Sequence, residues 1–177
     1  MSDRPFSNSD GSVGNLPFRD TARALVFDPA NRLLLIAYQA SRDVDPARPG
    51  LRRFWFTPGG GVEPGETHET AVVRELGEEI GVADAPRGPW VARRETPLTL
   101  FRRQCIARER YFVVRLPSDA IDTGNLAATE NDPILDVRWW PLDELAASGE
   151  IVEPASLLAL ARRILADDIP AEPVSLA

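Results

Sequence analysis

The sequence predicts a single α+β domain built on a mixed β-sheet. The chain has 177 residues, enough for one domain with a substantial core. Apolar runs of strand length recur along the chain and are interspersed with two or three helical patterns. These elements do not follow the regular alternation of a doubly wound sheet, so the predicted architecture is an α+β or mixed-sheet sandwich.

The first strands are predicted to form a β-hairpin. Two apolar runs, residues 21–28 and 32–39, are separated by a turn-forming Asp-Pro-Ala-Asn sequence. Residues 40–53 contain two prolines, one glycine and many charges, which indicates an exposed loop. Residues 54–57 predict a short strand that runs into Pro-Gly-Gly-Gly at 58–61, where the chain is expected to turn with unusual backbone angles.

A helix is predicted directly after the glycine run. Thr67 can cap its N-terminus, and Gly81 is placed to end it. The apolar residues between them fall on one stripe, which predicts that this side of the helix is buried. The stripe consists of Val72, Val73, Leu76 and Ile80.

The second half of the domain is predicted to contain three more strands and two short helices. The strands are expected at residues 90–95, 106–116 and 134–140, and the helices near 141–147 and 154–165.

The two ends of the chain differ in composition from this central part. Residues 1–17 are rich in Ser, Asn, Asp and Gly and predict a flexible N-terminal arm. Residues 18–168 are expected to form the folded domain. Residues 169–177 contain two prolines and predict a flexible C-terminal tail.

The composition excludes several classes of protein. The formal net charge of −7 argues against general binding of nucleic-acid polymers, which requires a net basic face. No apolar run approaches the roughly 18 residues that span a bilayer, and the polar N-terminal segment has no hydrophobic secretory core. The single cysteine fits a reducing compartment. We therefore expect a cytoplasmic protein that does not bind membranes.

The segment 60–82 carries the strongest chemical signal. Glu75, Glu78 and Glu79 are spaced i, i+3, i+4, which places three carboxylates on one face of the predicted helix. Such a group of acids suits Mg²⁺ or Mn²⁺, and a divalent cation would offset the repulsion among them. A carbonyl from Gly60 could complete the metal site, because glycine lets the backbone approach a ligand closely.

The same segment resembles the signature of the Nudix hydrolase family. That signature is a glycine, five residues, Glu, seven residues, and then Arg-Glu-apolar-any-Glu-Glu-any-Gly-apolar. Every fixed position is filled at the right spacing by Gly60, Glu66, Arg74, Glu75, Leu76, Glu78, Glu79, Gly81 and Val82.

The resemblance implies both a fold and roles for individual residues. The implied fold is a mixed β-sheet sandwiched between helices, and the signature forms a loop, a helix and a second loop. Glu75, Glu78 and Glu79 are implied as metal ligands or catalytic base. Glu66 and Arg74 are implied to hold the helix against its loop, although Arg74 could instead form only a surface ion pair with Glu78.

The implied activity is metal-dependent hydrolysis of the pyrophosphate bond in a nucleoside diphosphate linked to another moiety. ADP-ribose, nucleotide sugars, nucleoside triphosphates and dinucleoside polyphosphates all remain open as the small-molecule substrate. Pro97, fifteen residues after the signature, is typical of the ADP-ribose branch, in which pairing into a homodimer is common. The alternative is a non-catalytic Nudix domain that senses a nucleotide.

Four residues outside the signature are further candidates for the site. Arg52 and Arg53 could bind phosphate through their guanidinium groups. Glu109 and Glu130 could supply an additional acid, with Glu130 favoured because the loop 123–133 could fold over a cleft, but either could equally be a surface charge.

Overall fold

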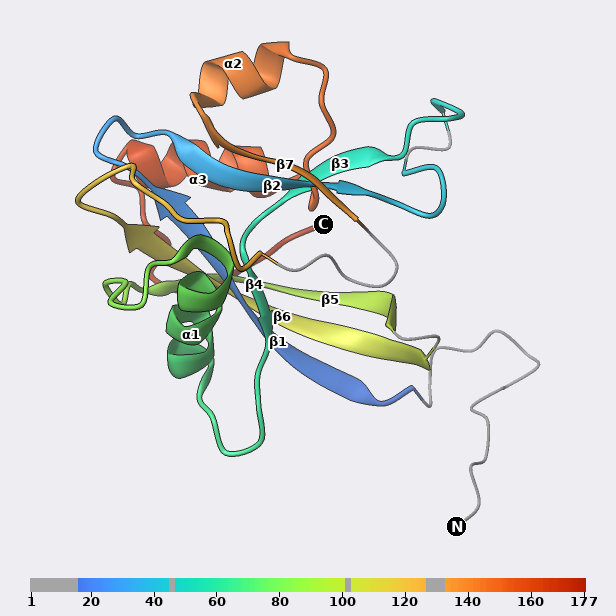
Figure 1. Cartoon of the computed structure of the whole chain (residues 1–177), viewed down its shortest axis with the longest axis horizontal. Helices are drawn as coiled ribbons and strands as arrows, with labels where there is room; N and C mark the ends of the chain where they lie inside the picture. The colour runs from blue at the N-terminus through green and yellow to red at the C-terminus, as the bar shows by residue number, and fades with distance from the viewer. Residues whose placement is uncertain (1–15, 45–46, 101–102, 127–132) are drawn as a thin grey trace.

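In the computed structural model, residues 16–44, 47–100, 103–126 and 133–177 are described. They form one mixed sheet of eight strands with a long helix on one face and two shorter helices on the other (Figure 1). This arrangement confirms the predicted α+β fold with a mixed sheet between helices. No helix in these ranges has the length and apolar character needed to cross a bilayer.

The elements agree in kind with those predicted, and two short strands are added. They follow in the order β1 (Phe18–Phe27), β2 (Leu33–Gln39), β3 (Arg53–Phe56), β4 (Gly59–Gly61), α1 (His68–Ile80), β5 (Trp90–Leu100), β6 (Arg103–Arg115), β7 (Ile134–Trp140), α2 (Leu142–Ala147), α3 (Leu157–Leu165) and β8 (Val174–Ser175).

The sheet is mixed because β1 and β6 run parallel along their length. The strand order is β3-β2-β1-β6-β5-β8, with β4 also paired to β1 and β7 to β2. The predicted hairpin of β1 and β2 is confirmed at its tip, where Phe27 pairs with Leu33. The Asp28 carboxylate stabilises this turn by accepting hydrogen bonds from the backbone N–H groups of Ala30 and Arg32, at 3.0 and 2.8 Å.

The glycine run differs from the predicted turn, because Gly59–Gly61 forms strand β4 antiparallel to β1. The close approach of the two backbones explains this. A Cβ on Gly59 would lie 2.1 Å from the Ala22 carbonyl oxygen, so only glycine fits between the strands. The unusual backbone angle that was predicted does occur, since Gly59 has φ +127°.

Helix α1 begins and ends where the sequence predicts. The Thr67 hydroxyl accepts a hydrogen bond from Thr70 N–H at 3.2 Å, and Gly81 ends the helix in the left-handed conformation at φ 72°. Leu76 and Ile80 are fully buried and pack with β1 and β6 residues in one of the two cores. This packing fixes the rotation of α1 and therefore the direction of its polar edge.

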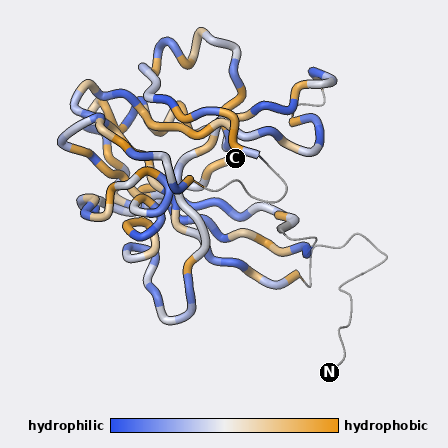
Figure 2. The backbone as a smooth tube through the Cα atoms, viewed as in Figure 1, coloured by the Kyte–Doolittle hydropathy of each residue, from blue (hydrophilic) through white to orange (hydrophobic). Residues whose placement is uncertain are grey.

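The second core lies on the opposite face of the sheet, beneath α2 and α3. Leu157 and Ile164 of α3 are fully buried there, together with Trp55 of β3. The Trp55 and Trp140 rings meet edge to face with centroids 5.1 Å apart. Hydrophobic residues follow one another along the central strands, whereas the helices carry both hydrophobic and hydrophilic residues (Figure 2).

The last residues of the segment 169–177, which is predicted to be a flexible tail, contact the folded domain. Strand β8 pairs parallel to β5, and Leu176 N–H donates to the Arg93 carbonyl at 2.9 Å. Leu176 is also buried in the second core, which explains why the tail is held. Most of the predicted N-terminal arm, residues 1–15, lies outside the described residues.

We expect Leu176→Ala to lower the free energy of unfolding by about 2 kcal/mol, because a buried leucine side chain is removed from the core. Urea denaturation measures the difference. Ser175→Ala is the matched control, since Ser175 directly precedes Leu176 but is exposed, and such changes cost less than about 0.5 kcal/mol. Equal stability of Leu176→Ala and the wild type would show that the tail does not contribute to the core.

Candidate active site

The signature acids lie along the polar edge of α1, but they differ in burial. The side chain of Glu75 is 13% exposed and that of Glu78 is 61% exposed. Glu79 is half-buried, one residue before the core residue Ile80. The i, i+3, i+4 spacing therefore keeps the three carboxylates on one edge, as predicted, while each has different surroundings.

Arg74 joins α1 to the loop that precedes it. Its Nε donates to Glu66 Oε1 at 3.1 Å, and its Nη2 donates to Glu66 Oε2 at 3.0 Å. Nη2 also donates to the Gly61 carbonyl at 2.8 Å. The bidentate bond to Arg74 lowers the pKa of Glu66 and raises that of Arg74, so both groups are charged.

The same guanidinium group also bridges two of the acids. Arg74 Nη1 donates to Glu75 Oε1 at 2.9 Å and to Glu78 Oε2 at 3.2 Å. Two carboxylates on adjoining turns of α1 thus share one cationic nitrogen. The surface ion pair considered from the sequence is present, and it coexists with the bonds from Arg74 to the loop.

Glu79 is held by the backbone of β4 and not by Arg74. Its Oε2 accepts a hydrogen bond from Gly59 N–H at 2.7 Å. Burial raises the pKa of Glu79 to about 7, and the Gly59 hydrogen bond and the charge of Arg23 oppose this rise. Burial also raises the pKa of Glu75, while the hydrogen bond and charge of Arg74 act to lower it. A nearby cation favours the ionised form of both groups.

Gly60 lies directly against the Glu75 carboxylate. A Cβ at Gly60 would come within 2.5 Å of Glu75 Oε1, so any larger residue here would displace the Glu75 carboxylate. The structure thereby brings Gly60 and Glu75 together.

The fit of these residues to a divalent cation depends on how closely their carboxylates gather. Among the residues that the structure describes, no three acidic, histidine or cysteine side chains are grouped closely enough to hold a metal ion as they stand. The predicted gathering of all three acids is thus incomplete, because Glu79 is held at Gly59 while Glu75 and Glu78 are held at Arg74. The donor chemistry does fit, since carboxylate oxygens suit Mg²⁺ and Glu75 and Glu78 already share one cationic group.

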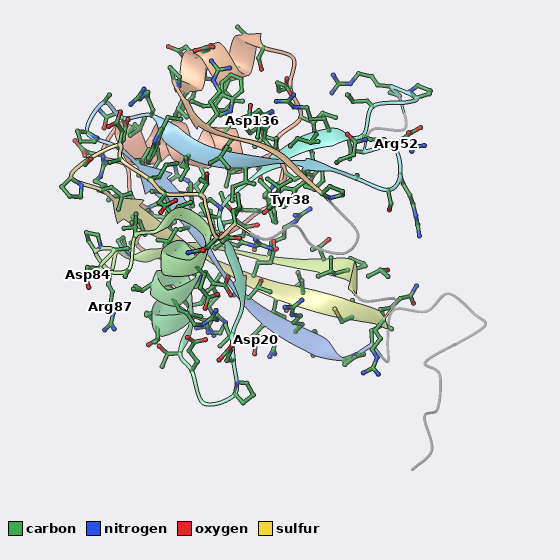
Figure 3. The ribbon with its side chains drawn as sticks, viewed as in Figure 1. Asp20, Tyr38, Arg52, Asp84, Arg87 and Asp136 are labelled. Carbon is green, nitrogen blue, oxygen red and sulfur yellow. The ribbon has the colours of Figure 1, made fainter. Side chains whose placement is uncertain are left out.

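The arginines proposed as phosphate contacts are not brought to these acids. Arg52 Nε lies 3.4 Å from Asp43 Oδ1 in an exposed ion pair. Arg52 is at the outer end of β3, away from α1 (Figure 3). Arg53 Nε lies 3.5 Å from Glu150 Oε2, and Arg53 Nη2 lies 3.6 Å from Asp136 Oδ2. Both arginines therefore have acidic partners of their own.

The two candidate acids outside the signature have different outcomes. Glu130 lies outside the described residues. Glu109 of β6 is buried at 4% exposure and accepts a hydrogen bond from the Tyr111 hydroxyl at 2.6 Å. It also lies 3.6 Å from Arg23 Nε and 3.7 Å from Arg94 Nη1, so the alternative of a surface charge is wrong for this residue.

Arg23, which contacts the glycine run from β1, is not among the residues predicted from the sequence. Its Nη1 donates to the Gly59 carbonyl at 2.5 Å. A signal was available in the strand pattern, because Arg23 is in phase with the inward-facing Leu25 and Phe27.

Comparisons with known proteins agree with this architecture. The model of the NUDIX domain matches residues 17–161. The chain is 29% identical over 103 residues to an RNA pyrophosphohydrolase of Wolbachia pipientis, a match that covers 54% of this chain and 63% of that protein. It is 32% identical over 110 residues to the nucleoside triphosphatase NudI of Salmonella typhimurium, covering 60% of this chain and 74% of that protein.

A similar fold is found in the NUDIX domain of Shewanella oneidensis NrtR, solved in complex with ADP ribose. The TM-score is 0.53 at 22% identity, covering 82% of this chain and 87% of that one. With a family model that matches most of its length and a mixed sheet between helices, this chain belongs to the NUDIX domain family.

Proposed function

We propose that this chain is a Mg²⁺- or Mn²⁺-dependent hydrolase that cleaves the pyrophosphate bond of a nucleoside diphosphate derivative. The observation that carries the proposal is the bridging position of Arg74, which fixes the loop through Glu66 and shares one nitrogen between Glu75 and Glu78. Two acids that already share one cationic group are suited to bind a divalent cation together.

Glu75, Glu78 and Glu79 would hold the cation, with the Gly60 carbonyl assisting. When bound, such a metal neutralises charge on the phosphates and lowers the pKa of a coordinated water. The chain's own residues supply the positioning. Arg74 and Glu66 hold the loop and the helix in a fixed relation, and Gly60 leaves room for the Glu75 carboxylate.

Water is the proposed nucleophile, and one of these glutamates takes its proton. The water oxygen bonds to one phosphorus of the pyrophosphate while the bridging P–O bond breaks. The products are a nucleoside monophosphate and a phosphorylated remainder. Since the acids belong to one helix whose rotation is fixed by the core, they are oriented before the substrate binds.

The names of the relatives suggest which substrates to test. They include a nucleoside triphosphatase and an RNA pyrophosphohydrolase. The neighbouring NrtR domain was solved with ADP ribose. A cytoplasmic location, homodimerisation and a preference for small nucleotides over nucleic-acid polymers stay predictions.

We expect phosphate release or nucleotide cleavage in a panel of candidates supplied with Mg²⁺ or Mn²⁺. The panel contains nucleoside triphosphates, ADP-ribose, nucleotide sugars, dinucleoside polyphosphates and RNA with a 5′-triphosphate. Chelation of the metal should stop the reaction, and added metal should restore it, because the acids alone cannot neutralise the phosphates. Product identification by mass spectrometry shows which bond is cut. Binding of a nucleotide without turnover would favour the sensor alternative.

A further inference from the structure

A partly buried arginine outside the signature reaches the glycine run from β1. The Arg23 side chain is only 15% exposed. Its Nη1 donates to the carbonyl oxygens of Gly59 and Thr57, at 2.5 and 3.4 Å. Because Gly59 N–H donates in turn to Glu79 Oε2 at 2.7 Å, Arg23 and Glu79 both bind the backbone of the same residue.

Arg23 is itself fixed by several neighbours. Glu109 Oε1 lies 3.6 Å from Arg23 Nε, and the guanidinium carbon lies 4.2 Å from the centre of the Phe56 ring. Glu109 is held by the Tyr111 hydroxyl at 2.6 Å and lies 3.7 Å from Arg94. Burial on its own would lower the pKa of Arg23, but the surrounding groups, Glu109 foremost, raise it overall, so the guanidinium group is charged.

Stability alone does not explain a charged network at this position. Replacing a buried ion pair by well-packed apolar residues of the same volume is often neutral or stabilising. The network ends, however, at a constrained residue, the first of strand β4. Gly59 has φ +127° and lies against the Ala22 carbonyl, and a strained residue persists only where its surroundings hold it in place.

We propose that Arg23 is a positioning residue, which binds the Thr57 and Gly59 carbonyls and thereby fixes the amide that orients Glu79. Its effect on catalysis rests on the hydrolase function proposed above. Its effect on the loop is a property of the protein without substrate and can be measured independently.

The test compares Arg23→Lys with Arg94→Lys. A lysine at 23 keeps the positive charge beside Glu109, but its single nitrogen cannot take both the place of Nη1 at the two carbonyls and that of Nε beside Glu109. Arg94→Lys makes the same chemical change on the other side of Glu109, where the arginine also binds Glu153 at 3.0 Å. It is therefore a control for disturbing the buried network.

We expect Arg23→Lys to lower kcat by about 10–100-fold with little change in KM, as is typical when a residue that orients a ligand is altered. Hydrogen exchange at the Gly59 amide, followed by NMR on the substrate-free protein, should become faster. Arg94→Lys should leave kcat and Gly59 exchange near the wild-type values. Thermal melting establishes that both variants are folded.

Three results would overturn the proposal. Wild-type kcat and Gly59 exchange in folded Arg23→Lys would show that Arg23 does not position the loop. Equal losses in Arg94→Lys would indicate a general packing effect. A raised KM with unchanged kcat would mean that Arg23 binds substrate directly.

The test has a second comparison for a variant that does not fold and a second measurement for a protein without activity. If Arg23→Lys does not fold, the double variant Arg23→Gln/Glu109→Gln, which removes both charges, is compared with Glu109→Gln alone. Faster Gly59 exchange in the double variant supports the proposal, and equal exchange overturns it. If the wild type hydrolyses no substrate in the panel, the proposed function fails, while Gly59 exchange still decides whether Arg23 holds the loop.

Discussion

Glu78→Gln is expected to reduce kcat by at least about 100-fold while leaving the fold intact. The substitution removes the charge of a carboxylate that shares Arg74 Nη1 with Glu75. Because the Glu78 side chain is 61% exposed, its replacement by an amide of the same shape should change the free energy of unfolding little. Steady-state kinetics on the best substrate, with circular dichroism as a folding check, measures both effects.

Glu69→Gln is the matched control for this variant. Glu69 is an exposed acid in the first turn of the same helix, at a position that the signature leaves variable. Its replacement removes the same charge from α1 and should leave kcat unchanged. The proposed site is contradicted if Glu78→Gln retains wild-type activity. It is also contradicted if both variants lose activity equally, because the loss would then follow from the charge of the helix and not from the position of the acid.

Gly59→Ala is expected to lower the free energy of unfolding by about 3 kcal/mol or more, which combines backbone strain with overpacking. The residue has φ +127°, and the added Cβ would lie 2.1 Å from the Ala22 carbonyl oxygen and 2.9 Å from the Arg23 Cα. Both contacts are to backbone atoms of β1, so no side-chain rotation can relieve them. Urea denaturation of the variant and the wild type gives the difference.

Gly65→Ala separates the two causes of this loss. Gly65 also has a positive φ, +83°, but nothing lies within 4 Å of the position that its Cβ would take. Gly65→Ala should therefore lower the free energy of unfolding by only about 1 kcal/mol, through backbone strain alone. If Gly59→Ala were no more destabilising than Gly65→Ala, the close approach of β4 to β1 would not be what requires glycine at position 59.

The local features of α1 could be predicted from the sequence because they depend on near neighbours along the chain. Thr67 and Gly81 act as caps through their own side-chain and backbone chemistry. The apolar stripe with Leu76 and Ile80 determined which side of the helix is buried. The acids then had to lie along one edge, since helix geometry brings i, i+3 and i+4 together.

The partner of each acid could not be predicted in the same way. The sequence placed Glu75, Glu78 and Glu79 together, but Glu79 is held at Gly59 while the other two share Arg74. That division depends on where β4 lies, and β4 lies where it does because three glycines allow the chain to approach β1.

The sequence by itself determined the α+β class, the register of the signature and the direction of its acidic edge, since helix periodicity and capping act within a few residues. Only the tertiary structure decided that Leu176 completes a core, that Arg52 and Arg53 pair away from the acids, and that Arg23 reaches Gly59 from β1. These contacts join residues far apart in the chain, and they arise from strand pairing and burial, which no local pattern specifies.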